Sequence, residues 1–419
     1  MIPNYKYSDR VMKMVGKEHA FLFNVNNCKL VRLPFDVYQI INNICEKRVS
    51  TGYVIENCET EEDRIYFNNV CKYLIENEII RNETDFCEYE NLDIEIDLDI
   101  TNVCNLRCKH CCVSASSADN DLSENDMRNV VDKVVAVNPR TIVISGGEPL
   151  MRKDFKDIIS RLRKNFRGQL GLMTNATLVN DEMAAFIASS FDNVSVSLDG
   201  VDEDSCSKIR GKGVFELSVA GIKRMQRYGL KKISASMVLT KYTIQYKDRF
   251  IYLCRKLNIE PCLRALSYVG RAKNNEAELS YEEIIHMCPD DGDVEYEFAF
   301  DVPIRTLFRC GAAYRQFQID SMGNIYPCQA LMYKELLLGN VLGVDDLNRY
   351  IRQRLFVSRS EYKTLETLFP YNYHGCKKCN KSVFCWTCLE DAFRHYGETP
   401  INGMCDCSLE QLTDKLKIV

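Results

Sequence analysis

Cys104-Asn105-Leu106-Arg107-Cys108-Lys109-His110-Cys111 is the stretch that decides the fold of this chain, because its thiols are spaced as C-x3-C-x2-C. Cysteine thiolates are the usual ligands of iron–sulfur clusters, and three of them can hold three irons of a [4Fe–4S] cluster. The fourth iron then has no protein ligand and can bind a small molecule. The motif therefore predicts chemistry at the metal and not electron transfer alone.

The surroundings of this motif are typical of an α/β fold. Residues 94–100 alternate apolar and acidic side chains and predict a strand, and the cysteines follow where that strand ends. A second apolar run, Thr141–Ile144, leads into Ser145-Gly146-Gly147-Glu148-Pro149. Glycines allow a ligand to approach the backbone closely, and Glu148 offers a carboxylate to a cationic group.

Together the two motifs resemble the radical S-adenosylmethionine (SAM) superfamily, in which C-x3-C-x-aromatic-C follows the first strand and G-G-E-P the second. The resemblance implies that Cys104, Cys108 and Cys111 hold the catalytic cluster, that its open iron binds SAM, and that His110 occupies the aromatic position. SAM contacts are also implied at further positions, which are Gly146, Gly147, Glu148, Asn175, Ser197 and Arg210. Thr174-Asn175-Ala176 departs from the T-N-G of many relatives, and Cys112 stands where an aromatic residue is common.

Residues 91–300 are expected to form the catalytic domain. Expected strands at 94–100, 140–145, 169–174, 192–198, 231–239 and 259–265 alternate with helical patterns at 123–137, 152–165, 180–188, 214–229 and 243–257. Such alternation predicts a parallel sheet with helical crossovers. Six strands are fewer than the eight of a closed barrel. The resemblance accordingly implies an open (β/α)6 partial TIM barrel.

Residues 1–90 predict a small winged-helix-like module. Short strands are expected at Arg10–Val15, His19–Val25 and Cys28–Leu33. Two helices should follow, one after Pro34 and one over Glu61–Asn77, the second with Ile65, Val70, Tyr73 and Leu74 spaced for burial. The module resembles the precursor-peptide recognition element of peptide-modifying enzymes. There a leader peptide adds as an extra strand to the third strand, which is Cys28–Leu33 here, with Lys29 and Arg32 as candidate contacts.

Residues 301–419 contain a field of cysteines. By residues alone, paired C-x2-C knuckles fit zinc as well as iron–sulfur clusters. Behind a radical SAM core they resemble the SPASM extension, which implies two auxiliary [4Fe–4S] clusters and thus three clusters in all. The first would use Cys310, Cys328 and Cys388, with Cys288 as fourth ligand or an iron left open to a substrate thiolate. The second would use Cys376, Cys379, Cys385 and either Cys405 or Cys407.

Composition excludes several classes of protein. The chain has 419 residues, a net charge of −5 and a pI near 5.8, so no basic field draws it to nucleic acid. It has no apolar run long enough to span a membrane and no signal peptide at its start. Its 21 cysteines are then expected to be metal ligands or buried thiols in a reducing, cytoplasmic compartment.

These observations predict a radical SAM maturase that modifies a leader-guided ribosomal precursor peptide and draws electrons from a flavodoxin- or ferredoxin-type donor. The expected reaction is thioether cross-linking, in which a cysteine sulfur joins a carbon of an acceptor residue. Carbon–carbon cross-linking, epimerisation and maturation of a peptide-derived redox cofactor are alternatives on the same scaffold. A cluster-bearing DNA-binding regulator and a non-catalytic zinc scaffold are the competing classes.

Overall fold

The computed structural model describes residues 4–8, 10–25, 29–83, 92–117, 121–274, 310–373 and 388–396. The chain divides into two compact units. The first holds residues 1–89, 284–311 and 366–419, and the second holds residues 90–283 and 312–365. Each unit is described by itself.

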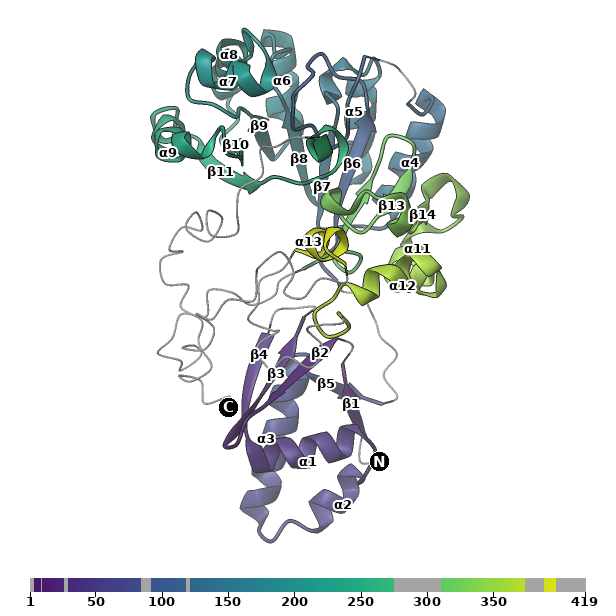
Figure 1. Ribbon diagram of the computed structural model, residues 1–419. Coiled ribbons are helices and arrows are strands. Elements are labelled where there is room, and N and C mark those ends of the chain that lie inside the picture. The colour runs from purple at the N-terminus through teal and green to yellow at the C-terminus, as the bar shows by residue number, and fades with distance from the viewer. Residues whose placement is uncertain are drawn as a thin grey trace. The chain divides into compact units, whose positions relative to one another are not determined.

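The second unit is built on a nine-stranded sheet in the order β11-β10-β9-β8-β7-β6-β12-β13-β14 (Figure 1). Its first six strands are parallel, and they are β6 (Glu95–Thr101), β7 (Thr141–Gly146), β8 (Gln169–Thr174), β9 (Asn193–Ser197), β10 (Ile233–Leu239) and β11 (Glu260–Ala265). Every strand expected from the sequence is present. The sheet is the mostly parallel sheet of a partial barrel.

Helices between these strands follow amphipathic patterns. They are α4 (Glu124–Ala136), α5 (Phe155–Asn165), α6 (Asp181–Ser190), α7 (Glu203–Arg210), α8 (Val214–Arg227) and α9 (Lys247–Lys256). Helix α4 begins after Ser123, whose side-chain oxygen accepts a hydrogen bond from the Asp126 N–H and so caps the helix. The helix buries Met127, Val130 and Val134. The sequence patterns did not predict α7, which is short and polar and begins with a capping box formed by Asp202 and Ser205.

The alternation of side chains in β6 sets which face of the sheet carries the site. Ile96, Leu98 and Ile100 are fully buried, whereas Asp97 and Asp99 point to the opposite face because successive side chains alternate. Serines at paired positions of β9 and β10, Ser197 and Ser236, line a cavity. One face of the sheet thus packs against helices and the other is polar.

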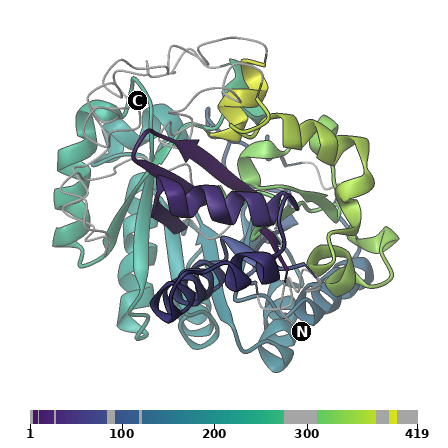
Figure 2. The same cartoon turned by 90° about the horizontal axis from the view of Figure 1, so that it is seen from below.

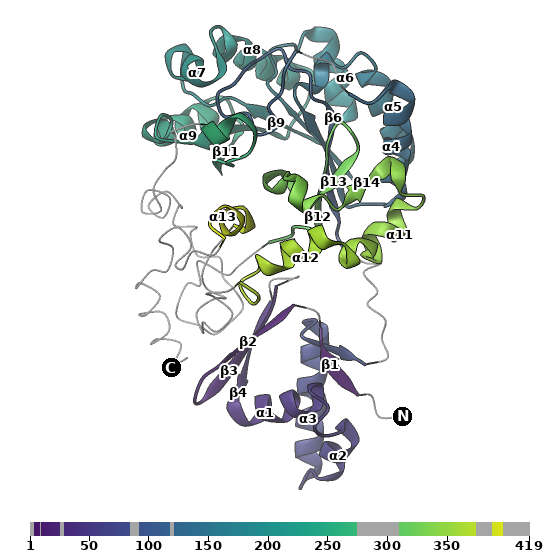
Figure 3. The same ribbon diagram turned by 45° about the vertical axis from the view of Figure 1, so that its right-hand side comes forward.

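The sheet continues into the C-terminal part of the chain (Figure 3). Strand β12 (Gln316–Ile319) pairs in parallel with β6, and β13 (Asn324–Tyr326) and β14 (Gly339–Asn340) extend it. Helix α11 (Leu347–Arg352) contacts α4. The segment expected to be a separate domain from residue 301 therefore contributes residues 312–365 to the barrel unit.

The first unit contains a three-stranded sheet of β2 (Val11–Val15), β3 (His19–Asn24) and β4 (Lys29–Pro34), with α1 (Phe35–Cys45) packed on β3 and β4 (Figure 2). The other elements of its first 83 residues are β1 (Tyr5–Tyr7), α2 (Thr51–Glu56), α3 (Glu61–Glu76) and β5 (Ile80–Asn82). Strands β1 and β5 pair with each other. Later in the chain, α12 (Ser360–Thr367) crosses the boundary between the units, and α13 (Leu389–Arg394) lies in the first.

Burial on α3 differs from the expectation. Phe67, Cys71 and Leu74 face the core, whereas Ile65 and Tyr73 are 54% and 44% exposed. The apolar residues of this helix lie on two faces, either of which could be buried. The face that contains Phe67 is the one that packs into the core. The expected burial of Ile65 and Tyr73 is therefore wrong.

Candidate functional site

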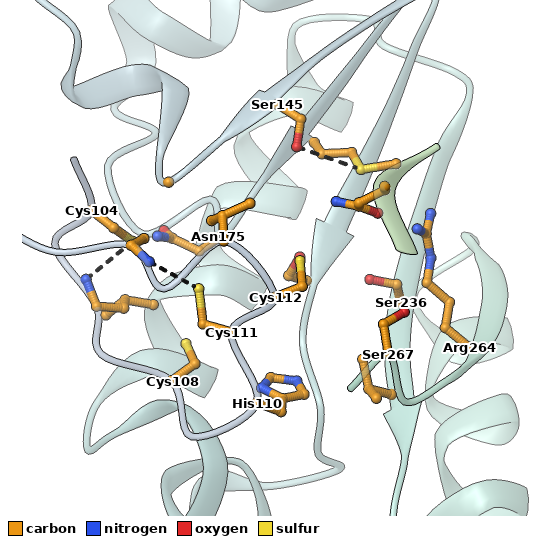
Figure 4. A pocket seen from close by; sticks show the side chains of 18 of the residues that line it. Cys104, Cys108, His110, Cys111, Cys112, Ser145, Asn175, Ser236, Arg264 and Ser267 are labelled. Carbon is orange, nitrogen blue, oxygen red and sulfur yellow. Dashed lines mark hydrogen bonds between the residues drawn. The ribbon is translucent and has the colours of Figure 1, made fainter. Parts of the chain in front are cut away.

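The three cysteines of the first motif line one cavity of about 220 Å³ at the carboxyl ends of the parallel strands (Figure 4). Of the other expected site residues, His110, Gly146, Gly147, Asn175, Ser197 and Arg210 line the same cavity. They come from the ends of β6, β7, β8 and β9 and from the last residue of α7, which the parallel sheet brings to one edge. Glu148 is fully buried beside the cavity and is not among the residues that line it.

Each of the three sulfurs accepts a hydrogen bond from a nearby N–H group. The Leu106 N–H donates to Cys104 Sγ and the Ala115 N–H to Cys111 Sγ, both over 3.3 Å. Arg210 Nη1 lies 3.8 Å from Cys108 Sγ. Hydrogen bonds of this kind surround cluster sulfurs and tune their potential. Burial raises the pKa of Cys104 to about 11, so metal binding has to displace thiol protons.

The donor set fits an iron–sulfur cluster better than a single ion. Within the described part of the chain no three His, Cys, Asp or Glu side chains are grouped closely enough to hold one metal ion. A four-iron cluster is wider than one ion, so its thiolate ligands stand farther apart. Three sulfurs around one cavity, each with an N–H donor, match that need.

Glycines 146 and 147 are required by the chain itself. A Cβ on Gly146 would lie 2.2 Å from the Thr101 carbonyl oxygen, and one on Gly147 would lie 2.3 Å from that of Val103. The Gly147 and Glu148 N–H groups donate to the Thr101 and Val103 carbonyls. The end of β7 can therefore lie directly on the start of the cysteine loop.

Glu148 joins the ends of β7 and β8. Its carboxylate accepts hydrogen bonds from Thr174 Oγ1 and the Asn175 N–H, each over 2.7 Å, and from the Leu150 N–H over 3.2 Å. Burial raises the pKa of Glu148 above its usual range, although these donors oppose the rise. The described structure shows Glu148 holding Asn175 at the cavity, and its expected contact with the SAM ammonium group stays a prediction.

Asn175 and Ala176 complete the end of β8. Asn175 Nδ2 donates to Asn105 Oδ1 of the cysteine loop over 2.9 Å. Ala176 has a φ of 58°, a left-handed conformation that glycine adopts more easily. The departure from the T-N-G of relatives thus keeps the glycine-like backbone at some conformational cost.

Asp199 is a functional residue that the sequence argument missed. Its fully buried carboxylate lies 2.7 Å from His110 Nε2 and 2.6 Å from Arg210 Nη2, and it accepts a hydrogen bond from the Val238 N–H. Burial favours the neutral form, but Arg210 and His110 hold the pKa of Asp199 well below its usual range. Asp199 therefore stays ionised and orients Arg210 toward Cys108. Its position after a buried strand was the available signal.

Arg271 is a second missed residue. Its Nε donates to the Cys108 carbonyl over 2.9 Å, its Nη1 to that of Ala115 over 2.6 Å, and its backbone N–H to that of Cys111 over 2.9 Å. Gly270, with a φ of 63°, lies so close that a Cβ would be 2.3 Å from the Cys112 carbonyl oxygen. The segment after β11 thus fastens the cysteine loop, which no local pattern indicated.

Only three of the predicted auxiliary-cluster ligands, Cys310, Cys328 and Cys388, are among the described residues. Cys288, Cys376, Cys379, Cys385, Cys405 and Cys407 lie outside the described residues. Cys310 and Cys388 belong to the first unit and Cys328 to the second. The described cysteines are thiols and form no disulfide. The two auxiliary clusters stay predictions.

Comparison with known proteins identifies the catalytic part. Residues 98–251 match the model of the radical SAM superfamily. The chain is a radical SAM enzyme. Its cofactors are accordingly SAM and a radical SAM iron–sulfur cluster, and the cavity that Cys104, Cys108 and Cys111 line is their predicted site.

Two curated relatives show the range of the match. Mycofactocin maturase MftC of Mycolicibacterium smegmatis is 26% identical over 260 residues, which span 58% of this chain and 66% of MftC. Fe-coproporphyrin III synthase of Methanosarcina barkeri is 32% identical over 191 residues, 44% of this chain and 47% of the relative. The chain thus spans two thirds or less of these relatives.

The fold also resembles solved structures. SuiB of Streptococcus suis bound to its precursor peptide SuiA has a TM-score of 0.59 at 15% identity, covering 96% of this chain and all of SuiB. At this identity the likeness shows the fold alone. In the described part of the chain, no helix has the length and apolar character needed to cross a membrane.

Proposed function

We propose that this radical SAM enzyme is a maturase of a leader-guided ribosomal precursor peptide and forms thioether cross-links in it. The observation that carries the proposal is the match of residues 98–251 to the radical SAM model, in a chain whose fold resembles a peptide-bound structure over 96% of its length. The mycofactocin maturase relatives support the same class of substrate.

The residues of the cavity have distinct roles in this proposal. Bound SAM and its cluster would supply a radical able to remove a hydrogen atom from an unreactive carbon. Cys104, Cys108 and Cys111 would hold the cluster. Asp199 orients Arg210, whose N–H group donates to Cys108 Sγ. Ser197 and Asn175 line the cavity where SAM would bind. Enclosure by the sheet and the cysteine loop would keep water from the reacting carbon.

The first 83 residues would select the substrate. Strand β4 is an edge of the described sheet, and its exposed side chains include Lys29 and Arg32. An extended leader segment can add to such an edge through backbone hydrogen bonds. A leader with acidic side chains would complement the two cations.

Anaerobic turnover with intact-mass analysis tests the proposal. The reconstituted enzyme is given SAM, dithionite and a short cysteine-containing peptide encoded beside its gene. Thioether formation removes two hydrogen atoms per link and makes one thiol per link resistant to alkylation. The same mass loss with every thiol still free would show carbon–carbon linkage. An unchanged mass in ordinary water, together with deuterium uptake when the reaction runs in D2O, would show epimerisation.

Two matched cysteine variants test whether cleavage of SAM depends on the predicted cluster ligands. Cys108→Ala should abolish cleavage of SAM to 5′-deoxyadenosine, whereas Cys112→Ala, beside the ligand set, should retain it.

The runner-up function is maturation of a peptide-derived redox cofactor, which the MftC relatives favour. It predicts a mass change other than the loss of two hydrogen atoms per link from the same peptide, with its thiols unchanged.

A further inference from the structure

Three arginines line the cavity in the described structure, and two of them have their partners within the protein. Arg210 is paired with Asp199 and directed to Cys108. Arg271 is bonded to carbonyl groups of the cysteine loop. Arg264 has no hydrogen bond or ion pair with any described residue, and its Nε is buried without an acceptor.

Arg264 also lies apart from the cluster ligands. It is in β11, next to Val238 of β10, and Figure 4 shows it across the cavity from Cys104, Cys108 and Cys111. Ser236 and Ser267 lie on its side of the cavity. This wall is therefore available to a molecule other than the cluster.

No carboxylate of the described residues neutralises this cation. Asp97 feels the field of Arg264 but forms no ion pair with it. Burial raises the pKa of Asp97 to about 7 and that of Asp99 to about 8, so these carboxyls carry reduced charge near neutral pH. Arg264 is half-buried with its Nε covered, and a ligand that brings an anion to this guanidinium gains a charge-assisted hydrogen bond.

The geometry of a guanidinium selects the kind of anion. Its two parallel N–H groups match the two oxygens of a carboxylate, and the neighbouring serine hydroxyls can donate further hydrogen bonds. A phosphate group, with more charge, would call for additional cations, and the other two arginines of the cavity are already engaged. A single carboxylate fits the wall best.

We propose that Arg264 binds a carboxylate of the precursor peptide, so that the modified segment contains Asp, Glu or the peptide's own C-terminus. The inference rests on the proposed function and names the substrate chemistry of the same cavity. It explains why one cavity cation has no partner among the described residues.

Small blocked amino acids test this without the natural peptide. The probes are N-acetylaspartate N-methylamide and its asparagine counterpart, then N-acetylalanine and its N-methylamide. Their binding to the cluster-loaded, SAM-bound enzyme is measured by saturation-transfer NMR. One acid of the two pairs should bind at least about tenfold more tightly than its amide, as expected for a charge-assisted bidentate contact. A preference in the aspartate pair would indicate a side-chain carboxylate, and a preference in the alanine pair would indicate the peptide's C-terminus.

Three variants make the result specific. Arg264→Gln should abolish the preference for the acid, Arg264→Lys should keep part of it, and Arg255→Gln, which removes an exposed charge from α9, should leave it unchanged. Iron content and SAM affinity should be those of the parent enzyme in all three.

Several outcomes would overturn the inference. These are equal binding of acids and amides, no binding of any probe, or a preference that survives in Arg264→Gln. A loss of SAM affinity in Arg264→Gln would also overturn it, because Arg264 would then serve the cofactor. Failure of the proposed function is a separate result, since it appears as an unmodified peptide in the mass assay.

Discussion

At the scale of single residues, Asp199 shows how one buried carboxylate can organise a site. It lies between His110 and Arg210 with no exposure to solvent, and these two side chains and the Val238 N–H stabilise its charge. Because a buried ion that loses its partner keeps its desolvation cost, breaking this arrangement should be expensive. Surface pairs, which remain solvated, should contribute little.

Asp199→Asn should therefore lower the free energy of unfolding of the metal-free protein by about 3–5 kcal/mol at neutral pH. Arg249→Gln, which breaks an exposed pair with Asp202, should cost less than about 1 kcal/mol. Urea unfolding followed by circular dichroism measures both. Because the folded-state pKa of Asp199 is lowered, its contribution should be complete above about pH 4 and be lost only in stronger acid. Equal stability of the two variants would contradict this assignment.

Arg271 offers a test that does not depend on turnover. Arg271→Lys keeps the charge but loses the fork that reaches two carbonyls, so the cysteine loop should hold its cluster less firmly. We expect iron release to a ferrous chelator, under anaerobic conditions, to be about tenfold faster, as for other changes beyond the ligands themselves. Arg255→Lys on α9 is the matched control. A lower melting temperature of the metal-free variant with unchanged iron release would show a purely structural role.

At the scale of elements, the approach of β7 to the loop after β6 is what shapes the cavity. Gly147→Ala would place a methyl group 2.3 Å from the Val103 carbonyl oxygen, and backbone cannot move aside cheaply. We expect a loss of about 1–3 kcal/mol in the free energy of unfolding, together with weaker SAM binding. Gly343→Ala, where a Cβ meets nothing within 4 Å, should change neither quantity. Normal SAM affinity in Gly147→Ala would show that the cavity tolerates a wider loop.

Strand β6 should also give the protein a characteristic pH dependence. Burial raises the pKa of Asp99 to about 8, so the folded state binds a proton that the unfolded state releases near pH 4. Stability should therefore fall as pH rises from 5 to 9. Asp99→Asn should remove part of this fall and be more stable than the parent at pH 8.5 by more than about 1 kcal/mol.

The amide of Asp99→Asn would also give Gln318 Oε1, which has no donor among the described residues, a hydrogen bond. Asp157→Asn, at an exposed position on α5, is the control and should leave the pH profile unchanged. Thermal unfolding of the metal-free protein at pH 5.5 and 8.5 measures the effect. Parallel profiles of Asp99→Asn and the parent would contradict the prediction.

At the scale of the whole molecule, two units divide the work that we propose. The barrel unit carries the chemistry, and the first 83 residues would recognise the leader. Reversing two charges on β4, Lys29→Glu with Arg32→Glu, should weaken binding of a fluorescent acidic leader peptide at least about tenfold, since like charges replace attraction. Cleavage of SAM without peptide should not change.

Lys17→Glu, in the turn between β2 and β3, changes a charge of the same module away from β4 and serves as the control. Fluorescence anisotropy gives the three affinities. Equal affinity of all three proteins for the leader would show that recognition takes place elsewhere on the chain.

The six parallel strands, most of the helices between them and the three cysteines of the first motif could be predicted from local sequence patterns. These follow from local rules, since the alternation in β6 and the amphipathic pattern of α4 report which face each element buries. Helix α7 was missed because eight mostly polar residues give a weak pattern, and β12 because four residues, Gln316–Ile319, predict no pairing partner.

Which residues meet at the site depends on the tertiary structure. Asp199 and His110, or Arg271 and Cys108, are far apart in the chain and share no local pattern. Their contacts depend on the order of the strands and on the loops that this order places side by side. Short-range periodicity reports the burial of each element, whereas the pairing of charges and carbonyls across a cavity is fixed only when all the strands have assembled.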